Sequence, residues 1–152
     1  MSEYNADGLR ARRLDAGLTQ RELAARTGIP QPNISAYEQG RRNPSEATIA
    51  RLDEVLRIPS LELLRRLRGP ILRAAEARGL SSVRVFGSVA TGGAHAQSDV
   101  DLLVHPTEAT SVFELAGFMA EVEELLGHQV DVVSDRGTGP AMDSIRSEAI
   151  PL

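Results

Sequence analysis

The chain has 152 residues, a net charge of −4 at neutral pH, no cysteine and few aromatic side chains. This composition excludes a disulfide framework and a thiolate metal site, and the longest apolar runs are too short to cross a membrane. The N-terminus carries no apolar signal segment. We therefore expect a soluble, cytoplasmic protein with no membrane contact.

Charge is distributed unevenly along the chain. Residues 1–67 carry 11 arginines and 9 acidic residues, whereas residues 68–152 carry 6 arginines and 12 acidic residues, giving net charges of +2 and −6. Such asymmetry predicts two domains with different partners. We expect an α+β chain, with an all-α domain of five helices at 1–68 and a small α/β domain with a short mixed sheet at 69–152.

Helix-capping signals organise the N-terminal segment. A first helix is predicted over 9–16 and ends at Gly17, a typical C-cap residue. Thr19 and Glu22 have the spacing of a capping box and predict a second short helix, which Gly28 closes.

Three more helices are predicted before residue 70. Pro30 and Pro32 fit the first turn of the third helix, where proline is tolerated. Ser45 caps the fourth helix, and the fifth stops at Gly69-Pro70. The apolar positions expected to be buried in these helices are Ile34, Tyr37, Ile49, Leu52, Val55, Leu56, Leu61, Leu64 and Leu67.

Two short helices joined through a glycine make a helix-turn-helix arrangement. The stretch LTQRELAARTGIPQPNISAYEQGRRNPS resembles the DNA-binding domains of the Cro/C1 (XRE) repressor family over about residues 5–58. The resemblance implies that the third helix lies in the major groove of double-stranded operator DNA, and that the protein acts as a homodimer. The residues implied to face base edges are Gln31, Pro32, Asn33, Ser35 and Ala36, and those near phosphates are Gln20, Arg41, Arg42 and Asn43.

This segment departs from the family pattern at one cap. Pro30 stands where the family often has Ser or Thr, so the usual side-chain cap is missing.

The alternative interpretation of residues 1–68 is a helical bundle used only for dimerisation or partner binding.

The C-terminal segment alternates helices and strands. The expected elements are a helix over 70–79, a strand over 82–86, a strand over 99–104, a helix over 108–126, a strand over 128–134 and a final helix that ends near Ile150.

Three aspartates and a Gly-Ser pair carry the chemistry of this segment. Asp99 and Asp101 are two residues apart in a predicted strand, so their side chains share a face, and Asp131 lies on a neighbouring strand. Paired carboxylates need a compensating cation, and hard oxygen ligands suit Mg²⁺ or Mn²⁺. Gly87 and Ser88 offer backbone N–H groups and a hydroxyl to phosphate oxygens.

The motif G-S-x10-D-x-D is similar to that of the nucleotidyltransferase superfamily that includes DNA polymerase β, and residues 70–152 resemble its minimal nucleotidyltransferase (MNT) family. The resemblance implies that Asp99, Asp101 and Asp131 bind metal, that Asp131 helps to deprotonate the acceptor hydroxyl, and that Gly87 and Ser88 hold the triphosphate of ATP or another NTP. One departure is Thr91, which stands where the family commonly has arginine. Two alternatives follow: Arg84, Arg136 or Arg146 substitutes for it, or the activity is weak.

The remaining polar residues have no assigned role. His95, His105 and His128 share no ligand spacing and are interpreted as solvated, and Asp135 and Asp143 as surface residues.

The combination resembles the antitoxins of HEPN–MNT toxin–antitoxin pairs. It implies a bifunctional antitoxin that represses its own operon and transfers AMP from ATP to a HEPN-type toxin. Two alternatives remain: a regulator whose inactive MNT domain senses nucleotide or binds a partner, and a toxin that modifies tRNA.

Overall fold

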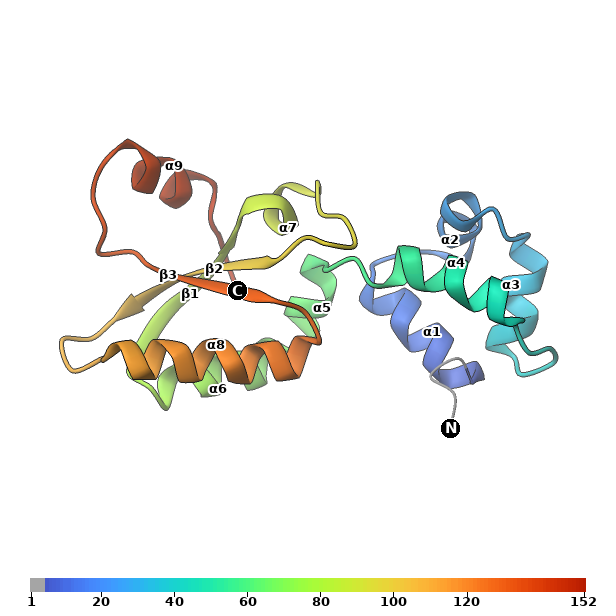
Figure 1. The fold of residues 1–152 in the computed structure, drawn as a ribbon, viewed down its shortest axis with the longest axis horizontal. Coiled ribbons are helices and arrows are strands. Elements are labelled where there is room, and N and C mark those ends of the chain that lie inside the picture. Colours follow the sequence, from blue (N-terminus) through green and yellow to red (C-terminus); the bar gives the residue numbers. More distant parts are fainter. Residues whose placement is uncertain (1–4) are drawn as a thin grey trace.

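The computed structural model describes residues 5–152, so the first four residues of the expected N-terminal domain lie outside the described residues. Its elements in chain order (Figure 1) are α1 Ala6–Asp15, α2 Gln20–Thr27, α3 Gln31–Glu38, α4 Glu46–Leu56, α5 Leu61–Arg66, α6 Arg68–Glu76, β1 Leu80–Phe86, α7 Gly87–Thr91, β2 Val100–Pro106, α8 Val112–Leu126, β3 Val130–Ser134, α9 Pro140–Glu148 and β4 Ile150–Pro151.

The helix caps of the N-terminal region follow the sequence signals. The Thr19 hydroxyl accepts a hydrogen bond from the Glu22 backbone N–H, and the Glu22 carboxylate accepts one from the Thr19 N–H, so the predicted capping box is confirmed. Gly28 ends α2 with a φ of 68°, and Ser45 caps α4. Pro30 precedes α3 without a side-chain cap, as its lack of a polar group requires.

The buried apolar residues form two separate clusters. The first gathers α1 to α4 around Leu9, Leu23, Ile34 and Leu52. The second extends from α5 to β3 and includes Leu64.

Helix α5 therefore links the two clusters. It buries Leu64 in the second, while the Arg66 guanidinium pairs with Asp15 of α1 at 2.7 Å and the Ser60 hydroxyl donates to the Asp15 carbonyl. The domain boundary expected after residue 68 stays a prediction.

A mixed four-stranded sheet of order β3-β2-β1-β4 forms the centre of the C-terminal unit. β1 pairs antiparallel with β2 and β4, and β2 pairs parallel with β3. The parallel pair needs a crossover, which α8 provides. The overall architecture is thus the expected one, a helical region followed by a small mixed-sheet domain.

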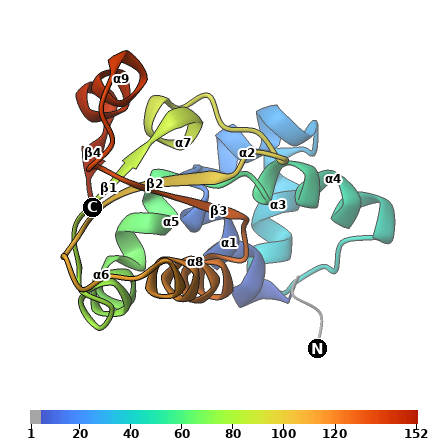
Figure 2. The same ribbon diagram turned by 60° about the vertical axis from the view of Figure 1, so that its left-hand side comes forward.

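Helices cover the two faces of this sheet differently. α6 and α8 lie along one face, where the second hydrophobic cluster is buried, and the short α7 and α9 lie on the other (Figures 1 and 2). We call this second side the α7 face. Within residues 5–152, no helix has the length and apolar character needed to cross a membrane.

The ends of several elements differ from the predicted ones. β1 begins at Leu80 rather than at 82, α6 covers Arg68–Glu76 rather than 70–79, β2 covers Val100–Pro106 rather than 99–104, α8 begins at Val112 rather than at 108, and β3 begins at Val130 rather than at 128. Gly69-Pro70 falls inside the first turn of α6, where a proline costs no hydrogen bond.

The short strand β4 was not expected. The Leu152 N–H donates to the Val83 carbonyl, which extends the pairing of β4 with β1.

Candidate functional site

An acidic centre lies at the end of the sheet where β2 and β3 begin. Asp101 is the second residue of β2 and is in register with Asp131 of β3. Their neighbours Val100 and Val130 are buried in the cluster under α6 and α8, so alternation places both carboxylates on the α7 face. Asp99 lies one residue before β2, so the prediction that it is a strand residue was wrong.

The three carboxylates interact electrostatically. Asp101 is half-buried, whereas Asp99 and Asp131 are exposed. The pKa of Asp101 is raised above its ordinary value, first by burial and then by the negative charges of Asp131 and Asp99. The sheet register agrees with this, since Asp131 lies beside Asp101 on the neighbouring strand.

The chemistry of the centre suits a hard divalent cation. Carboxylate oxygens are the ligands that Mg²⁺ and Mn²⁺ prefer, and a cation between these groups would remove their mutual repulsion. Within residues 5–152, however, no three acidic, histidine or cysteine side chains are already gathered as a metal site. The residues thus fit the ion by type and by sharing one end of the sheet.

Gly87 stands directly beside the acidic centre. It has a φ of 70°, which favours glycine, and a Cβ atom there would overlap a carboxylate oxygen of Asp101. Gly87 opens α7, and the Thr91 hydroxyl at the end of α7 lies 3.2 Å from the Gly87 carbonyl. Ser88 follows in the first turn and is partly buried. The Gly-Ser pair and the aspartates therefore meet at one place.

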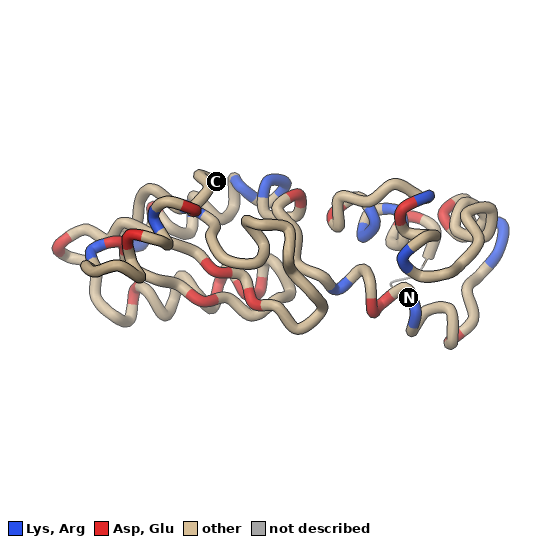
Figure 3. The backbone as a smooth tube through the Cα atoms, turned by 90° about the horizontal axis from the view of Figure 1, so that it is seen from above, with Lys and Arg blue, Asp and Glu red and all other residues tan. Residues whose placement is uncertain are grey.

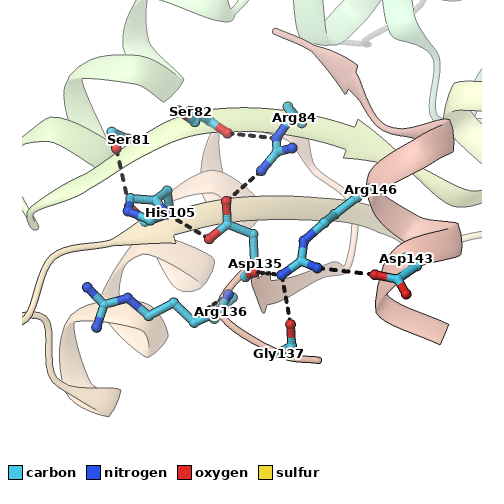
Figure 4. Close-up of polar contacts among 10 residues, drawn as sticks. Ser81, Ser82, Arg84, His105, Asp135, Arg136, Gly137, Asp143 and Arg146 are labelled. Carbon is cyan, nitrogen blue, oxygen red and sulfur yellow. Dashed lines mark hydrogen bonds and ion pairs between the residues drawn. The ribbon is translucent and has the colours of Figure 1, made fainter. Parts of the chain in front are cut away.

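Asp135 is not the surface residue that the sequence interpretation assumed. Its side chain is only 14% exposed, and it binds the Arg84 guanidinium at 2.6 Å and the His105 ring Nδ1 at 2.8 Å (Figure 4). Asp131, Val133 and Asp135 alternate on one face, and the Asp135 N–H still donates to β2. The spacing of two residues between Asp131, Val133 and Asp135 is the sequence pattern that could have placed Asp135 on the same face as Asp131.

The arginines expected to replace the missing one at Thr91 are engaged or distant. Arg84 also donates to the Ser82 carbonyl, and Arg146 donates to the carbonyls of Asp135 and Gly137 (Figure 4). Arg136 follows the opposite end of β3 from Asp131, and residues 131–134 alone span about 10 Å of strand.

The histidines differ from one another. The Nδ1 atom of His95 accepts the Gln97 N–H within its own loop, as expected for a loop residue. His105 is engaged by Asp135 rather than only solvated. His128 is half-buried, and burial lowers its pKa.

A second polar network supports the helix-turn-helix. The Arg13 guanidinium binds both Glu38 carboxylate oxygens, at 2.6 and 3.0 Å, and donates to the Leu18 carbonyl. Gln20 donates to Glu38, and Gln31 donates to Gln20, both at 2.9 Å. Burial alone would raise the pKa of Glu38, but hydrogen bonds from Arg13 and Gln20 and the charge of Arg13 hold it below its usual value.

The network fixes two of the residues implied to contact DNA. Gln31 at the start of α3 and Gln20 at the start of α2 are bridged, so their amide groups are oriented before any ligand binds. The Ser35 hydroxyl accepts from Gln39, a residue that the sequence interpretation did not include.

The other implied DNA contacts lie on or just after α3. Pro32 is exposed at its start, Asn33 and Ala36 are partly buried along it, and Arg41, Arg42 and Asn43 are exposed in the loop before α4.

Two protein families match the chain. The helix-turn-helix family matches residues 9–63, and the nucleotidyltransferase domain family matches residues 70–150. These matches define the class: a helix-turn-helix protein with a nucleotidyltransferase domain. The chain belongs to the nucleotidyltransferase domain family and carries an XRE-type helix-turn-helix before that domain.

Individual relatives divide in the same way. "Uncharacterized HTH-type transcriptional regulator y4dJ" of Sinorhizobium fredii is 42% identical over 34% of this chain and 68% of its own length. "Putative protein adenylyltransferase MJ0435" of Methanocaldococcus jannaschii is 35% identical over 49% of this chain and 81% of its own. A solved structure, "Structure of putative minimal nucleotidyltransferase", is 44% identical with a TM-score of 0.56, covering 61% of this chain and 96% of that one.

Proposed function

We propose that the protein is a bifunctional antitoxin: a sequence-specific autorepressor and a protein nucleotidyltransferase that moves AMP from ATP to a partner toxin of the HEPN type. The nucleotidyltransferase family and the helix-turn-helix family support the two halves of this proposal. A relative named as a protein adenylyltransferase supports ATP and a protein acceptor. The two functional units are proposed to cover residues 1–68 and 69–152.

The observation that carries the catalytic half is the pairing of Asp101 with Asp131 directly beside Gly87. In this proposal Asp99, Asp101 and Asp131 hold Mg²⁺ or Mn²⁺, and Gly87 and Ser88 hold the triphosphate. When bound, the metal lowers the charge repulsion of the triphosphate and stabilises the departing pyrophosphate.

The proposed reaction is a balanced group transfer. The acceptor oxygen forms a bond to the α-phosphorus, the bridging bond between the α- and β-phosphates breaks, and pyrophosphate leaves with that electron pair. A carboxylate oxygen of Asp131 takes the hydroxyl proton and passes it to solvent. Asp131 is exposed at the rim of the site, so an acceptor carried by another protein can reach it.

The experiment uses the whole chain, α-³²P-labelled ATP, Mg²⁺ and the product of the neighbouring gene. We expect label on the partner with the wild type and none with the Asp99→Asn/Asp101→Asn variant. The control is Asp143→Asn, which removes an exposed acid on α9 and should transfer label normally. Wild-type protein that binds ATP but transfers nothing would refute the catalytic half.

The DNA-binding half rests on α3 and its flanks. Gln31, Pro32, Asn33, Ser35 and Ala36 are proposed to meet base edges, and Gln20, Arg41, Arg42 and Asn43 phosphates, with a homodimer on two half-sites of operator DNA.

One observation favours a second candidate function. Thr91 replaces arginine while Arg84 and Arg146 are engaged elsewhere, which would suit a regulator whose nucleotidyltransferase domain binds nucleotide without transferring it. Nucleotide binding without label transfer is its signature. A toxin that modifies tRNA is disfavoured by the acidic charge of residues 68–152.

A further inference from the structure

No arginine of residues 68–152 forms an ion pair with Asp99, Asp101 or Asp131. Residues 68–152 contain six arginines. Three of them are in ion pairs: Arg78 with Glu121 at 2.6 Å, Arg84 with Asp135 at 2.6 Å and Arg146 with Asp143 at 3.4 Å. The Arg84 guanidinium makes two contacts, to the Asp135 carboxylate and to the Ser82 carbonyl (Figure 4).

The other three arginines lie elsewhere on the domain. Arg68 and Arg73 belong to α6. This helix covers one face of the sheet, and α7 lies on the other face (Figure 1). Arg136 follows the end of β3 that is remote from Asp131. Over the whole segment acidic residues outnumber basic ones, 12 to 6, and Figure 3 shows where both kinds lie along the backbone.

The charged residues that form the centre are all acidic. Asp131 is in register with Asp101 on the neighbouring strand, and Asp99 lies two residues before Asp101. Thr91 reaches the Gly87–Ser88 turn with a neutral hydroxyl, which lies 3.2 Å from the Gly87 carbonyl. A triphosphate held at the Gly87–Ser88 turn would meet the neutral Thr91, while Arg84 and Arg146 are already bound to other groups.

We infer that the acceptor supplies the missing charge: the substrate is a basic segment of a partner protein, with an arginine or lysine close to the acceptor hydroxyl. This inference rests on the proposed transferase function. An arginine delivered in trans is an established way to stabilise the charge on a transferring phosphoryl group. A basic segment also complements the net charge of −6 on residues 68–152. An RNA acceptor would add negative charge to a site that already repels it.

Synthetic acceptors test this directly. The whole chain is incubated with α-³²P-labelled ATP, Mg²⁺ and one of three peptides that share a central tyrosine and differ only in flanking arginine, serine or glutamate. Bulk tRNA is a fourth acceptor. We expect transfer to the arginine-flanked peptide to exceed transfer to the serine-flanked one by about tenfold or more at low salt. Added salt should shrink that ratio, because exposed charges are screened.

A substitution in the protein provides the reciprocal test. Thr91→Arg places a cation at the Gly87–Ser88 turn, so it should raise transfer to the serine-flanked peptide and reduce the preference for arginine. Thr91→Gln is the matched control, since it adds length without charge and should leave the preference unchanged.

The outcomes separate this inference from the transferase proposal. Release of AMP to water, lost in Asp101→Asn, reports the chemistry without any peptide. AMP release combined with equal rates on the arginine- and serine-flanked peptides, or faster transfer to tRNA, overturns the basic-acceptor inference alone. Neither AMP release nor transfer to any acceptor overturns both.

Discussion

Gly87 gives the most specific prediction about how the backbone builds the acidic centre. Gly87→Ala should destabilise the C-terminal unit for two reasons, a φ of 70° and the overlap of the new Cβ with the Asp101 carboxylate. Gly92 is the matched control, since it ends the same helix with a φ of 78° and has nothing within 4 Å of a built Cβ.

The two substitutions share one cost and differ in the other. A left-handed backbone costs a non-glycine residue about 1–2 kcal/mol, so Gly92→Ala should lower the free energy of unfolding by that amount. At Gly87 the new Cβ would also meet the end of the Asp101 side chain. This side chain can rotate away, so the second cost in stability should be small and should appear mainly as a displaced Asp101 carboxylate.

Urea unfolding followed by far-ultraviolet circular dichroism measures both variants. AMP release in the presence of Mg²⁺ is the second readout, and it should be lost in Gly87→Ala because Asp101 is displaced, while Gly92→Ala retains it. AMP release kept in both variants would refute the assigned proximity of Gly87 and Asp101.

Three further predictions concern the N-terminal helices, their ion pair and α5. Glu38→Gln should lower the free energy of unfolding at neutral pH by about 3 kcal/mol, because Glu38 is paired with Arg13 and its side chain is 3% exposed. The pKa of Glu38 is lowered in the folded state. The ion pair therefore stabilises the fold at pH values above the ordinary glutamate pKa of about 4.3, and this stabilisation is lost as the pH falls through the lower folded-state pKa. Urea titrations at acid pH would contradict this if the difference in unfolding free energy between wild type and variant stayed constant. In DNA titrations at several salt concentrations, Arg42→Ala should weaken binding to all sequences and reduce the slope of log K against log salt by about 1. Asn33→Ala should instead relax the sequence preference. Equal salt slopes for the two variants would count against the assignment of Arg42 to a phosphate and Asn33 to a base. Leu64→Ala should lower the free energy of unfolding by about 2–5 kcal/mol and reduce hydrogen-exchange protection in the sheet. Leu52→Ala should reduce protection in α1 to α4 instead. Loss of protection in the same amides from both variants would show that the two clusters form one core.

Local rules were sufficient for the N-terminal helices. Thr19 with Glu22, Gly28 and Ser45 are short-range signals, and each acts where the pattern predicted. What sequence could not supply is the contact between Arg13 and Glu38, which joins α1 to α3 across 25 residues. Arginine and glutamate at such a separation have no pattern that distinguishes a buried pair from two solvated side chains.

The acidic centre was predictable in composition but not in detail. The G-S-x10-D-x-D motif brought Gly87 and Asp101 together, and their close approach in the structure agrees with it. Asp99 lies outside β2, since the strand begins at Val100, one residue later than the sequence pattern predicted. Asp135 was misjudged since its partners Arg84 and His105 come from β1 and β2, and only the sheet order places them beside it.

The most direct test of the account is calorimetric titration of the whole chain with α,β-methylene ATP, in the presence and absence of Mn²⁺. If the carboxylates hold the metal, nucleotide binding should depend on Mn²⁺ in the wild type, be lost in Asp101→Asn and be retained in Asp143→Asn. Nucleotide binding of the same strength with and without Mn²⁺, unaffected by Asp101→Asn, would contradict the claim that the carboxylates of β2 and β3 form a metal-assisted nucleotide site.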